Sequence, residues 1–281
     1  MKLIADSGST STNWVLIEND GTQKKFNTEG YNPFFIKSDG IVKSLSAQLL
    51  SHLNADAVSE IHFYGSGVSN AENVKTIDDA FRICFPNAKN FIEHDLLSSC
   101  RALLGRERGF AAILGTGTNT AIYDGEKVEM NIDSLGYALG DEGSGSYIGR
   151  LLLRSYLRDF MPQELAESFR KKFLVTEKNE ILRNIYDQPL PNRFLASYAS
   201  FIEGQSHPFI SDLIHLAFHD FFENIVSHYP RYTEYTFNCV GSIAFHQQEI
   251  LKQVSSEFGM RTGKIIQSPI DELVKFHLME K

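Results

Sequence analysis

Two stretches of the chain, 4-IADSGSTSTNWVLIENDG-21 and 112-AILGTGTNTAIYDG-125, have the same layout although they lie far apart. In each, a short apolar strand runs into a turn of Gly, Ser and Thr, a second strand follows, and Asp-Gly ends the unit. Small turn residues let backbone N–H groups approach an anion closely, and the hydroxyl groups add further donors. The repeat therefore predicts two phosphate-binding hairpins, one in each of two domains.

The first turn follows a strand that ends near Asp6, whose carboxylate can hold Mg²⁺, usually through water, beside bound phosphates. The candidate phosphate contacts in this turn are Gly8, Ser9, Thr10 and Thr12. The sequence lacks the GxxxxGK[ST] pattern of a P-loop. Taken alone, the turn also fits an ordinary hairpin rich in Ser and Thr.

The second turn favours the phosphate interpretation. Its candidate contacts are Gly115, Thr116 and Gly117. Two glycines flank a threonine after an apolar strand, where an ordinary tight hairpin more often carries Asn-Gly or Asp-Gly. Two such turns in one chain are better explained by a shared polyphosphate ligand than by two unrelated hairpins.

Three further stretches carry polar groups at the ends of expected strands or helices. In 136-GYALGDEGSGSYIG-149, Asp141 lies among glycines before a long helix, where it can bind a polar substrate or, with Glu142, favour the helix N-terminus. Asp95 stands where a strand passes into a helix, which suits either a general base or an N-cap. In 239-CVGSIAFH-246, Gly241 and Ser242 form a ledge that fits an adenine or ribose, or a plain strand-to-helix turn.

The composition narrows the class of protein. The 281 residues are 42% hydrophobic and 22% charged, as in globular proteins, and no apolar run approaches a membrane span. The net charge of −8 argues against nucleic acid and favours a small-molecule ligand. Three widely spaced cysteines without a CxxC pair fit a cytoplasmic protein and disfavour zinc or iron–sulfur sites. The N-terminus enters a strand at once, so we expect no signal peptide.

The order of the expected elements indicates an α/β fold of two domains. Strands and helices alternate over the first hundred residues, and a second unit begins with the strand at 110–115. Residues 143–228 have apolar spacing typical of helices, and a strand at 235–241 leads into another helix. We expect domains at 1–105 and 106–268, with a last helix at about 269–281, opened by Pro269, packing back on the first domain.

Taken in order, these pieces resemble the actin-like ATPase superfamily in its sugar-kinase branch, and most closely the N-acetylglucosamine kinase and BadF/BadG/BcrA/BcrD ATPase family. The most specific stretches are Gly115–Asn119 (GTGTN), Gly140–Ser144 (GDEGS) and Val240–Ser242 (VGS). The resemblance implies two related, ribonuclease H-like domains, each a mixed sheet with helices, and a nucleotide cleft between them. It also implies that the repeated hairpin reflects an ancient duplication.

The resemblance also implies roles for single residues. Thr10 and Thr116 would meet the phosphates of ATP, and Asp95 would be the catalytic carboxylate. The sugar would contact Asn32, Asn119 and Asp141, with Leu135 and Gly136 at the pocket wall, and Gly241 would fall in the adenosine motif. The family often has Gly-Trp-Gly where this chain has Ser134-Leu135-Gly136, so the sugar pocket is expected to differ.

The implied reaction is transfer of the ATP γ-phosphoryl group to a hydroxyl of an amino sugar, with ATP and Mg²⁺ required and Asp95 accepting the hydroxyl proton. Two other classes stay open: an ATPase that activates a redox partner, and a non-catalytic sugar sensor. Activators resemble proteins with cluster-ligating cysteines, and sensors carry an added DNA-binding module that has no counterpart here. Fold analogy suggests a homodimer through the helical part of the second domain.

Overall fold

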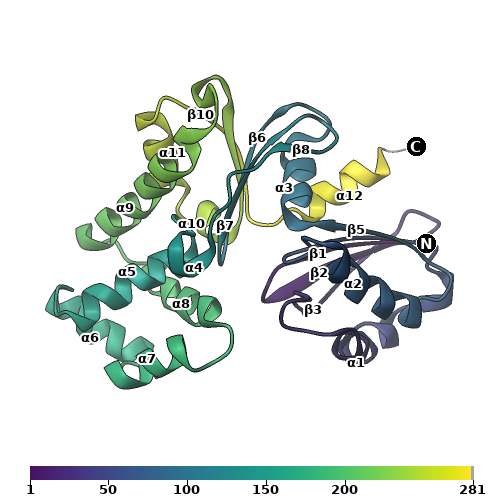
Figure 1. The fold of residues 1–281 in the computed structure, drawn as a ribbon, viewed down its shortest axis with the longest axis horizontal. Coiled ribbons are helices and arrows are strands. Elements are labelled where there is room, and N and C mark those ends of the chain that lie inside the picture. Colours follow the sequence, from purple (N-terminus) through teal and green to yellow (C-terminus); the bar gives the residue numbers. More distant parts are fainter. Residues whose placement is uncertain (280–281) are drawn as a thin grey trace. The chain divides into compact units, whose positions relative to one another are not determined.

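The computed structural model describes residues 1–279 and divides into two compact units (Figure 1). The first unit contains Met1–Arg106 together with the segment that begins at Pro269, and the second contains Glu107–Ser268. Each unit is built around one five-stranded mixed sheet.

The sheet of the first unit has the strand order β3-β2-β1-β4-β5. Its strands are β1 (Lys2–Ser7), β2 (Ser11–Ile17), β3 (Gln23–Glu29), β4 (Glu60–Gly65) and β5 (Lys89–His94). The first three strands form an antiparallel meander, and β4 and β5 add in parallel to β1. Because β1, β4 and β5 run in the same direction, their carboxyl ends meet at one edge of the sheet, which is where α/β proteins place ligands.

Helices cover both faces of this sheet. They are α1 (Ser38–Gln48), α2 (Ala71–Cys84), α3 (Asp95–Leu104) and α12 (Ile270–Leu278), with short 3-10 turns at Leu50–His52 and Ala55–Ala57. Figure 1 shows α1 and α2 on one face and α3 and α12 on the other. Trp14 is fully buried under α1 and α2, with its ring within 6.3 Å of the rings of Tyr31, Phe63 and Phe81.

The sheet of the second unit repeats this topology. Its order is β10-β9-β6-β7-β8, formed by β6 (Gly109–Leu114), β7 (Thr118–Tyr123), β8 (Val128–Met130), β9 (Thr236–Val240) and β10 (Arg261–Ile266). Again the first three strands form an antiparallel meander and the last two add in parallel. The two repeated hairpins of the sequence therefore occupy equivalent places, β1–β2 in one sheet and β6–β7 in the other.

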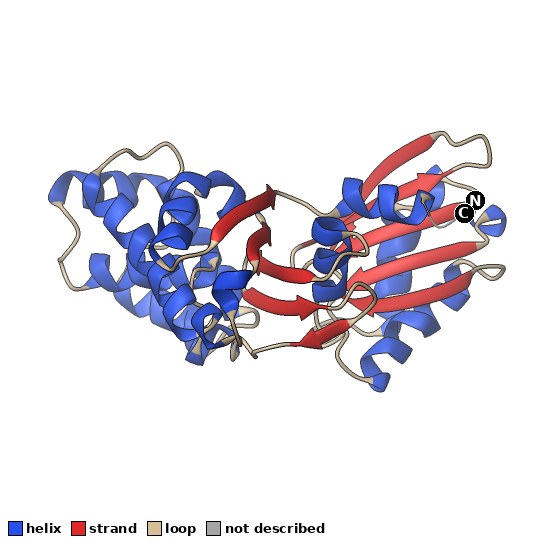
Figure 2. Cartoon of the chain, turned by 90° about the horizontal axis from the view of Figure 1, so that it is seen from above, coloured by secondary structure: helices blue, strands red, loops and turns tan. Residues whose placement is uncertain are grey.

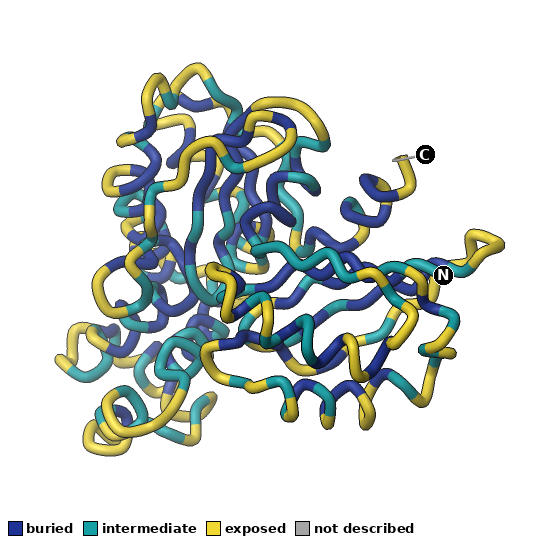
Figure 3. The backbone as a smooth tube through the Cα atoms, turned by 45° about the vertical axis from the view of Figure 1, so that its right-hand side comes forward, coloured by how far each residue is buried: buried dark blue, intermediate teal, exposed yellow. Residues whose placement is uncertain are grey.

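The second unit is larger because a helical region lies between its third and fourth strands (Figure 2). The helices of this region are α4 (Gly136–Leu139), α5 (Gly145–Leu157), α6 (Gln163–Lys172), α7 (Lys178–Tyr186), α8 (Pro191–Ala199) and α9 (Pro208–Asn224). Two further helices, α10 (Ser242–His246) and α11 (Gln248–Glu257), lie between β9 and β10. Short 3-10 turns lie at Ser200–Ile202, Val226–His228 and Tyr232–Glu234. The rings of Phe221 and Phe222 on α9 lie 6.2 and 5.0 Å from that of Phe237 on β9, so this helix packs directly on the sheet. Figure 3 shows buried and exposed stretches alternating along the helical tubes, and on α9 the buried residues are Ile210, Leu213, Ile214, Ala217, Phe218, Phe221 and Phe222.

Several boundaries differ from those expected. Strand β10 was not expected, because RTGKII mixes polar and apolar residues without clear alternation. The single helix expected after the strand at 235–241 is split at Gln247 into α10 and α11. Asp95 is the first helical residue of α3 instead of its cap. Of the last helix, expected at about 269–281, residues 280–281 lie outside the described part of the chain.

Membrane insertion by a helix has no support in the part of the chain that the structure describes, since none of its helices combines the length and the apolar character that a span requires.

Contact between α5 and α8 depends on Gly149, where a Cβ atom would overlap the backbone carbonyl of Leu195. We expect Gly149→Ala to destabilise the protein by about 1–3 kcal/mol, because overpacking against backbone outweighs the gain of about 1 kcal/mol in helix propensity. Thermal unfolding would measure this effect, with Arg154→Ala on the exposed side of α5 as control. A Gly149→Ala protein as stable as the wild type would contradict the packing described here.

Candidate active site

The turn of the first hairpin exposes its backbone at the edge of the sheet. Gly8 N–H donates to the carbonyl of Ser11 at 3.0 Å and closes the turn, while Gly8 and Thr10 are exposed to solvent. Thr12 lies on the inner side: its hydroxyl is fully buried, 2.7 Å from the Ser7 hydroxyl, and it donates to the carbonyl of Glu29. The sequence grouped Thr12 with the phosphate contacts, whereas the structure places it beneath the turn.

The segment after β3 lies against this turn. Gly30 N–H donates to the carbonyl of Thr10 at 3.0 Å, and a Cβ atom on Gly30 would overlap the carbonyl of Gly8. The next residue, Tyr31, donates its N–H to the Ser7 hydroxyl at 3.0 Å. Asn32, a predicted sugar contact, is buried and accepts a hydrogen bond from the N–H of Phe34. Gly30 and Tyr31 therefore connect the first turn, which holds the expected phosphate contacts, to Asn32, the expected sugar contact.

Asp6 is partly buried at the end of β1 and points toward α3. Its Oδ1 accepts a hydrogen bond of 2.9 Å from the hydroxyl of Ser98 on that helix. Burial raises the pKa of Asp6 to about 7, the hydrogen bond from Ser98 opposes this shift, and the negative charge of Asp95 adds to it. Two carboxylates close enough to repel one another have a donor set and a charge that suit a divalent cation with oxygen ligands.

Asp95 follows β5 directly, and the register explains its position. Gly65 of β4 pairs with Ser7 on one side and with His94 on the other, so Asp95 lies just beyond the strand ends. Burial raises the pKa of Asp95, whereas the charge of His94 and hydrogen bonds from the Leu96 backbone and the Ser66 side chain act in the opposite direction.

The N-cap of α3 is His94, whereas the sequence left open whether Asp95 is the cap or a general base. The Nδ1 atom of His94 accepts from the N–H of Leu97 at 3.2 Å, and the backbone of His94 is extended. Because the imidazole satisfies this free N–H group, the Asp95 carboxylate is not used as a cap.

The second hairpin turn is held from below by the start of α5. Gly115 N–H donates to the carbonyl of Gly117 within the turn. The carbonyls of Gly115 and Thr116 accept from the N–H groups of Gly145 and Ser146 at 2.8 and 3.0 Å. The helix N-terminus thus uses its free donors to fix the turn, and the N-cap of α5 is the Ser144 side chain.

Asp141 lies beside the same turn. It is 6% exposed and accepts from the Thr118 N–H at 3.0 Å, and a Cβ atom on Gly117 would lie 3.1 Å from both of its carboxylate oxygens. Burial raises the pKa of Asp141, and the Thr118 N–H and the Ser134 side chain counteract the shift. Its φ of 56° is left-handed, a conformation that few non-glycine residues adopt and that often occurs at functional sites.

The other predicted sugar contacts lie on β7 and before α4. Asn119 accepts through Oδ1 from the N–H of Thr120 and from the side chain of Asn131 at 2.9 Å. Leu135 is left-handed and 60% exposed, and Gly136 begins α4 with a φ of 67°.

Gly241 packs on the end of β6. Its N–H donates to the carbonyl of Ile266, and a Cβ atom would overlap the carbonyl of Leu114, which precedes the second turn. Its φ of 133° is available mainly to glycine. Ser242, exposed at the start of α10, lines a cavity of about 170 Å³. The other lining residues are Ala196, Ser197, Ala199, Ser200, Ile202, Glu203, Ile243, His246 and Gln247. No sequence motif indicated that residues of α8 would line this cavity.

No protein-family model matches the sequence, and no curated protein matches it. Among solved structures, the chain is similar to the proposed N-acetylglucosamine kinase of Porphyromonas gingivalis, with 34% identity, a TM-score of 0.93 and coverage of 100% of this chain and 99% of that one. The chain belongs to the N-acetylglucosamine kinase family. Its two sheets are those of the actin-like ATPase fold.

Two more distant structures share the fold of this family member. The proposed N-acetylglucosamine kinase of Chromobacterium violaceum has a TM-score of 0.73 and 17% identity, covering 98% of both chains. A ROK family glucokinase from Streptomyces griseus, solved with glucose and AMPPNP, has a TM-score of 0.55 and 14% identity, covering 99% of this chain and 98% of the other.

The close contact of Gly30 with the first turn leads to a prediction about the stability of this protein. We expect Gly30→Ala to lower the free energy of unfolding by about 1–3 kcal/mol, because the added methyl group meets backbone that cannot rotate away. Thermal unfolding would measure the change. Gly115→Ala is the matched control, since a Cβ atom there meets nothing within 4 Å. Equal melting temperatures for the two variants would contradict the close backbone approach at Gly30.

Proposed function

We propose that this protein is an ATP-dependent sugar kinase that transfers the γ-phosphoryl group of ATP to a hydroxyl of an amino sugar, N-acetylglucosamine or a related N-acetylated hexose. The carrying observation is the pair of partly buried carboxylates, Asp6 and Asp95, at the edge of the sheet where the first turn exposes its backbone. Membership of a family named for this reaction, on 34% identity over the whole chain, supports the same assignment.

In the first unit, the proposed roles follow from position. The exposed backbone and hydroxyl groups of Gly8, Ser9 and Thr10 bind phosphate oxygens, while Thr12 supports the turn from below. Asp6 would hold Mg²⁺, directly or through water, and the bound cation would supply charge neutralisation for the phosphates of ATP. The raised pKa of Asp6 fits this role, because a nearby cation would stabilise the ionised form that burial disfavours.

In the second unit, Gly115, Thr116 and Gly117 are the proposed counterpart phosphate contacts. Asn119 and Asp141 are the proposed contacts of this unit with sugar hydroxyl or acetamido groups, and Leu135 and Gly136 the proposed pocket wall. Asn32 is the proposed sugar contact of the first unit. Gly241 and Ser242 bind adenosine, and the cavity that Ser242 lines offers apolar and hydroxyl groups for the base and ribose.

Catalysis in this scheme is mainly alignment and charge neutralisation, because phosphoryl transfer has a loose transition state. Backbone N–H groups and hydroxyls of the two turns stabilise charge on the transferring group. Asp95 orients the attacking sugar hydroxyl and accepts its proton late in the transfer. The proton ends on the Asp95 carboxylate, the phosphoryl group on the sugar oxygen, and the electron pair of the broken bond on ADP.

The cysteines fit a kinase better than a redox activator. Cys84, Cys100 and Cys239 are all buried and unbonded, and burial raises the pKa of Cys100 to about 12. The three cysteines lie on α2, α3 and β9, and the sequence holds no CxxC pair of the kind that ligates a cluster. The chemistry of these side chains therefore gives no support to the activator class.

Replacing the proposed base gives a direct test. We expect Asp95→Asn to reduce kcat by roughly 10²-fold or more, the usual range for loss of a general base, with ATP binding retained. Glu93→Gln, two residues earlier on β5, is the control and should leave kcat near the wild-type value. A coupled assay of ADP release would measure turnover, and calorimetric titration with an ATP analogue would measure binding separately. Near-normal turnover in Asp95→Asn would remove Asp95 from this role.

The substrate class is tested by Mg²⁺-dependent ADP release against a panel of sugars. We expect stimulation by N-acetylglucosamine or another N-acetylated hexose, and weaker stimulation by glucosamine and neutral hexoses. Chelation of Mg²⁺ should abolish the release. ADP release that no sugar stimulates would overturn the kinase assignment and favour an ATPase that acts on a protein partner.

A further inference from the structure

Helix α3 carries two polar side chains toward the end of β1. Asp95 is its first residue, and Ser98 lies almost one turn later on the same stripe of the helix. The Ser98 side chain is completely buried, and its hydroxyl donates a hydrogen bond of 2.9 Å to Asp6 Oδ1. In the described part of the chain, Asp6 Oδ2 has no hydrogen-bond partner, so Ser98 alone fixes the orientation of this carboxylate from the protein side.

We propose that Ser98 is a positioning residue for phosphoryl transfer: its hydroxyl ties the Asp6 carboxylate to the helix turn that presents Asp95, which keeps the two carboxylates at one separation. This inference rests on the proposed kinase function and goes beyond it, because it assigns the link between the cation-holding group and the base. A fixed carboxylate loses less rotational freedom when it takes up its ligand, so the link favours binding and alignment together.

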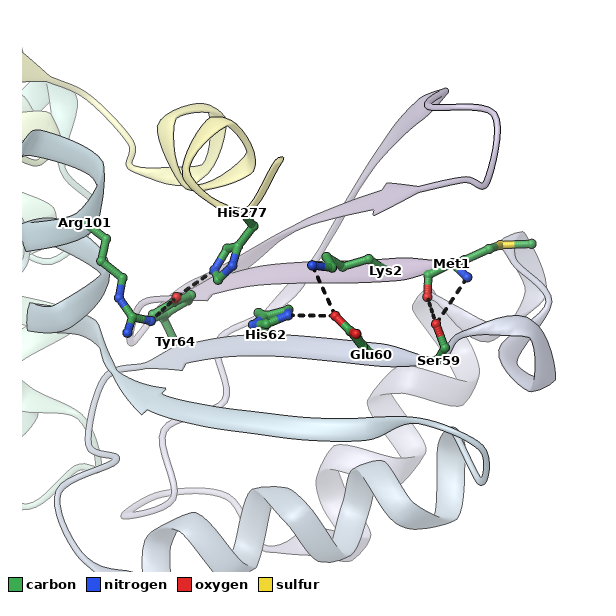
Figure 4. Close-up of polar contacts among 8 residues, drawn as sticks. All are labelled: Met1, Lys2, Ser59, Glu60, His62, Tyr64, Arg101 and His277. Atoms are coloured by element: carbon green, nitrogen blue, oxygen red, sulfur yellow. Dashed lines mark hydrogen bonds and ion pairs between the residues drawn. The ribbon is translucent and has the colours of Figure 1, made fainter. Parts of the chain in front are cut away.

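Contacts of α3 with β4 and α12 keep Ser98 in place, and Figure 4 shows three of the residues that make them, Arg101, Tyr64 and His277. Arg101, three residues after Ser98, donates from Nη1 to the Tyr64 hydroxyl at 2.6 Å, and this hydroxyl lies 2.7 Å from Nε2 of His277 on α12. The guanidinium also lies over the ring of Phe276, 5.2 Å from its centroid. Helix α3 is therefore bound to β4 and α12, and its rotation or sliding relative to Asp6 would break these contacts.

Tyr64 joins this support to the strand that pairs with β1. In the parallel register Tyr64 lies opposite Asp6, and Ser66, two residues further on, hydrogen-bonds to Asp95. The same end of β4 thus positions both carboxylates: Asp6 through strand pairing, and Asp95 through the hydrogen bond from the Ser66 side chain. Ser98 adds the only direct side-chain hydrogen bond to Asp6 among residues 1–279.

The neighbouring Ser99 provides a matched control. It is also buried on α3, at 2% exposure, but its hydroxyl donates to the carbonyl of Asp95 in its own helix at 3.1 Å. Replacing either serine by alanine removes one buried hydroxyl from the same helix turn, and alanine favours the helix. Only the Ser98 change removes the contact with Asp6.

The test compares Ser98→Ala, Ser98→Thr and Ser99→Ala with the wild type. We expect Ser98→Ala to lower kcat about tenfold or more, in line with the loss of a hydrogen bond to a charged group, without raising KM for the sugar. It should also weaken binding of Mn²⁺ in the presence of AMPPNP, followed by electron paramagnetic resonance. Ser98→Thr keeps the hydroxyl and should restore much of both properties, and Ser99→Ala should change neither.

Several outcomes would overturn the role of Ser98. They are a kcat and a Mn²⁺ titration within twofold of wild type in Ser98→Ala, equal losses in the two alanine variants, or a wild type that binds no Mn²⁺ with AMPPNP. Thermal unfolding of each variant separates a folding defect from a loss of positioning. Because the Mn²⁺ titration needs no sugar, weaker binding in Ser98→Ala would support the role even if no sugar were phosphorylated.

Discussion

Close approach of backbone to backbone at the hairpin turns is the constraint on which both candidate half-sites depend. In the first unit, Gly30 lies against the carbonyl of Gly8, and in the second, Gly241 lies against the carbonyl of Leu114. A side chain at either glycine would push the neighbouring turn out of place. Backbone can therefore approach each turn closely from behind, which leaves the outer surface of the turn open to a ligand.

The N-termini of α5 in the second unit and α3 in the first unit are used in different ways. In the second unit, the first N–H groups of α5 donate to carbonyls of the turn and are consumed by the protein itself. In the first unit, α3 is capped by His94, and its first residue, Asp95, is free to present a carboxylate at the edge of the sheet. The start of α5 thus supports a turn, whereas the start of α3 carries the proposed base.

Three partly or fully buried carboxylates, those of Asp6, Asp95 and Asp141, lie where hydrogen-bond donors of the protein can stabilise them. Asp6 and Asp95 are only partly exposed, their pKa values are raised by burial, and hydrogen bonds from Ser98 and Ser66 partly offset that effect. Asp141 has a similar environment beside the second turn, with the Thr118 N–H as its partner. Each proposed functional carboxylate therefore has at least one fixed donor from the protein, which orients it before any ligand binds.

Much of this protein could be read from its sequence, because the information was local. The repeated strand–turn–strand pattern predicted both hairpins, and the family resemblance and the actin-like fold that it implied are confirmed. Signals that depend on contacts between distant segments were missed: β10 was unrecognised because its pairing with β9 decides its conformation, and His94 was overlooked as a cap because imidazole is an uncommon one. The assigned roles of single site residues stay predictions.

The sequence by itself determined which residue types stand at the ends of strands, since spacing and turn chemistry are properties of neighbouring residues. Tertiary structure alone decided which of them meet. Thr12 faces inward because strand pairing alternates side chains between faces, and Ser98 reaches Asp6 across 92 positions of the chain because α3 packs over β1. Such pairings follow from sheet register and helix packing, which no short stretch of sequence encodes.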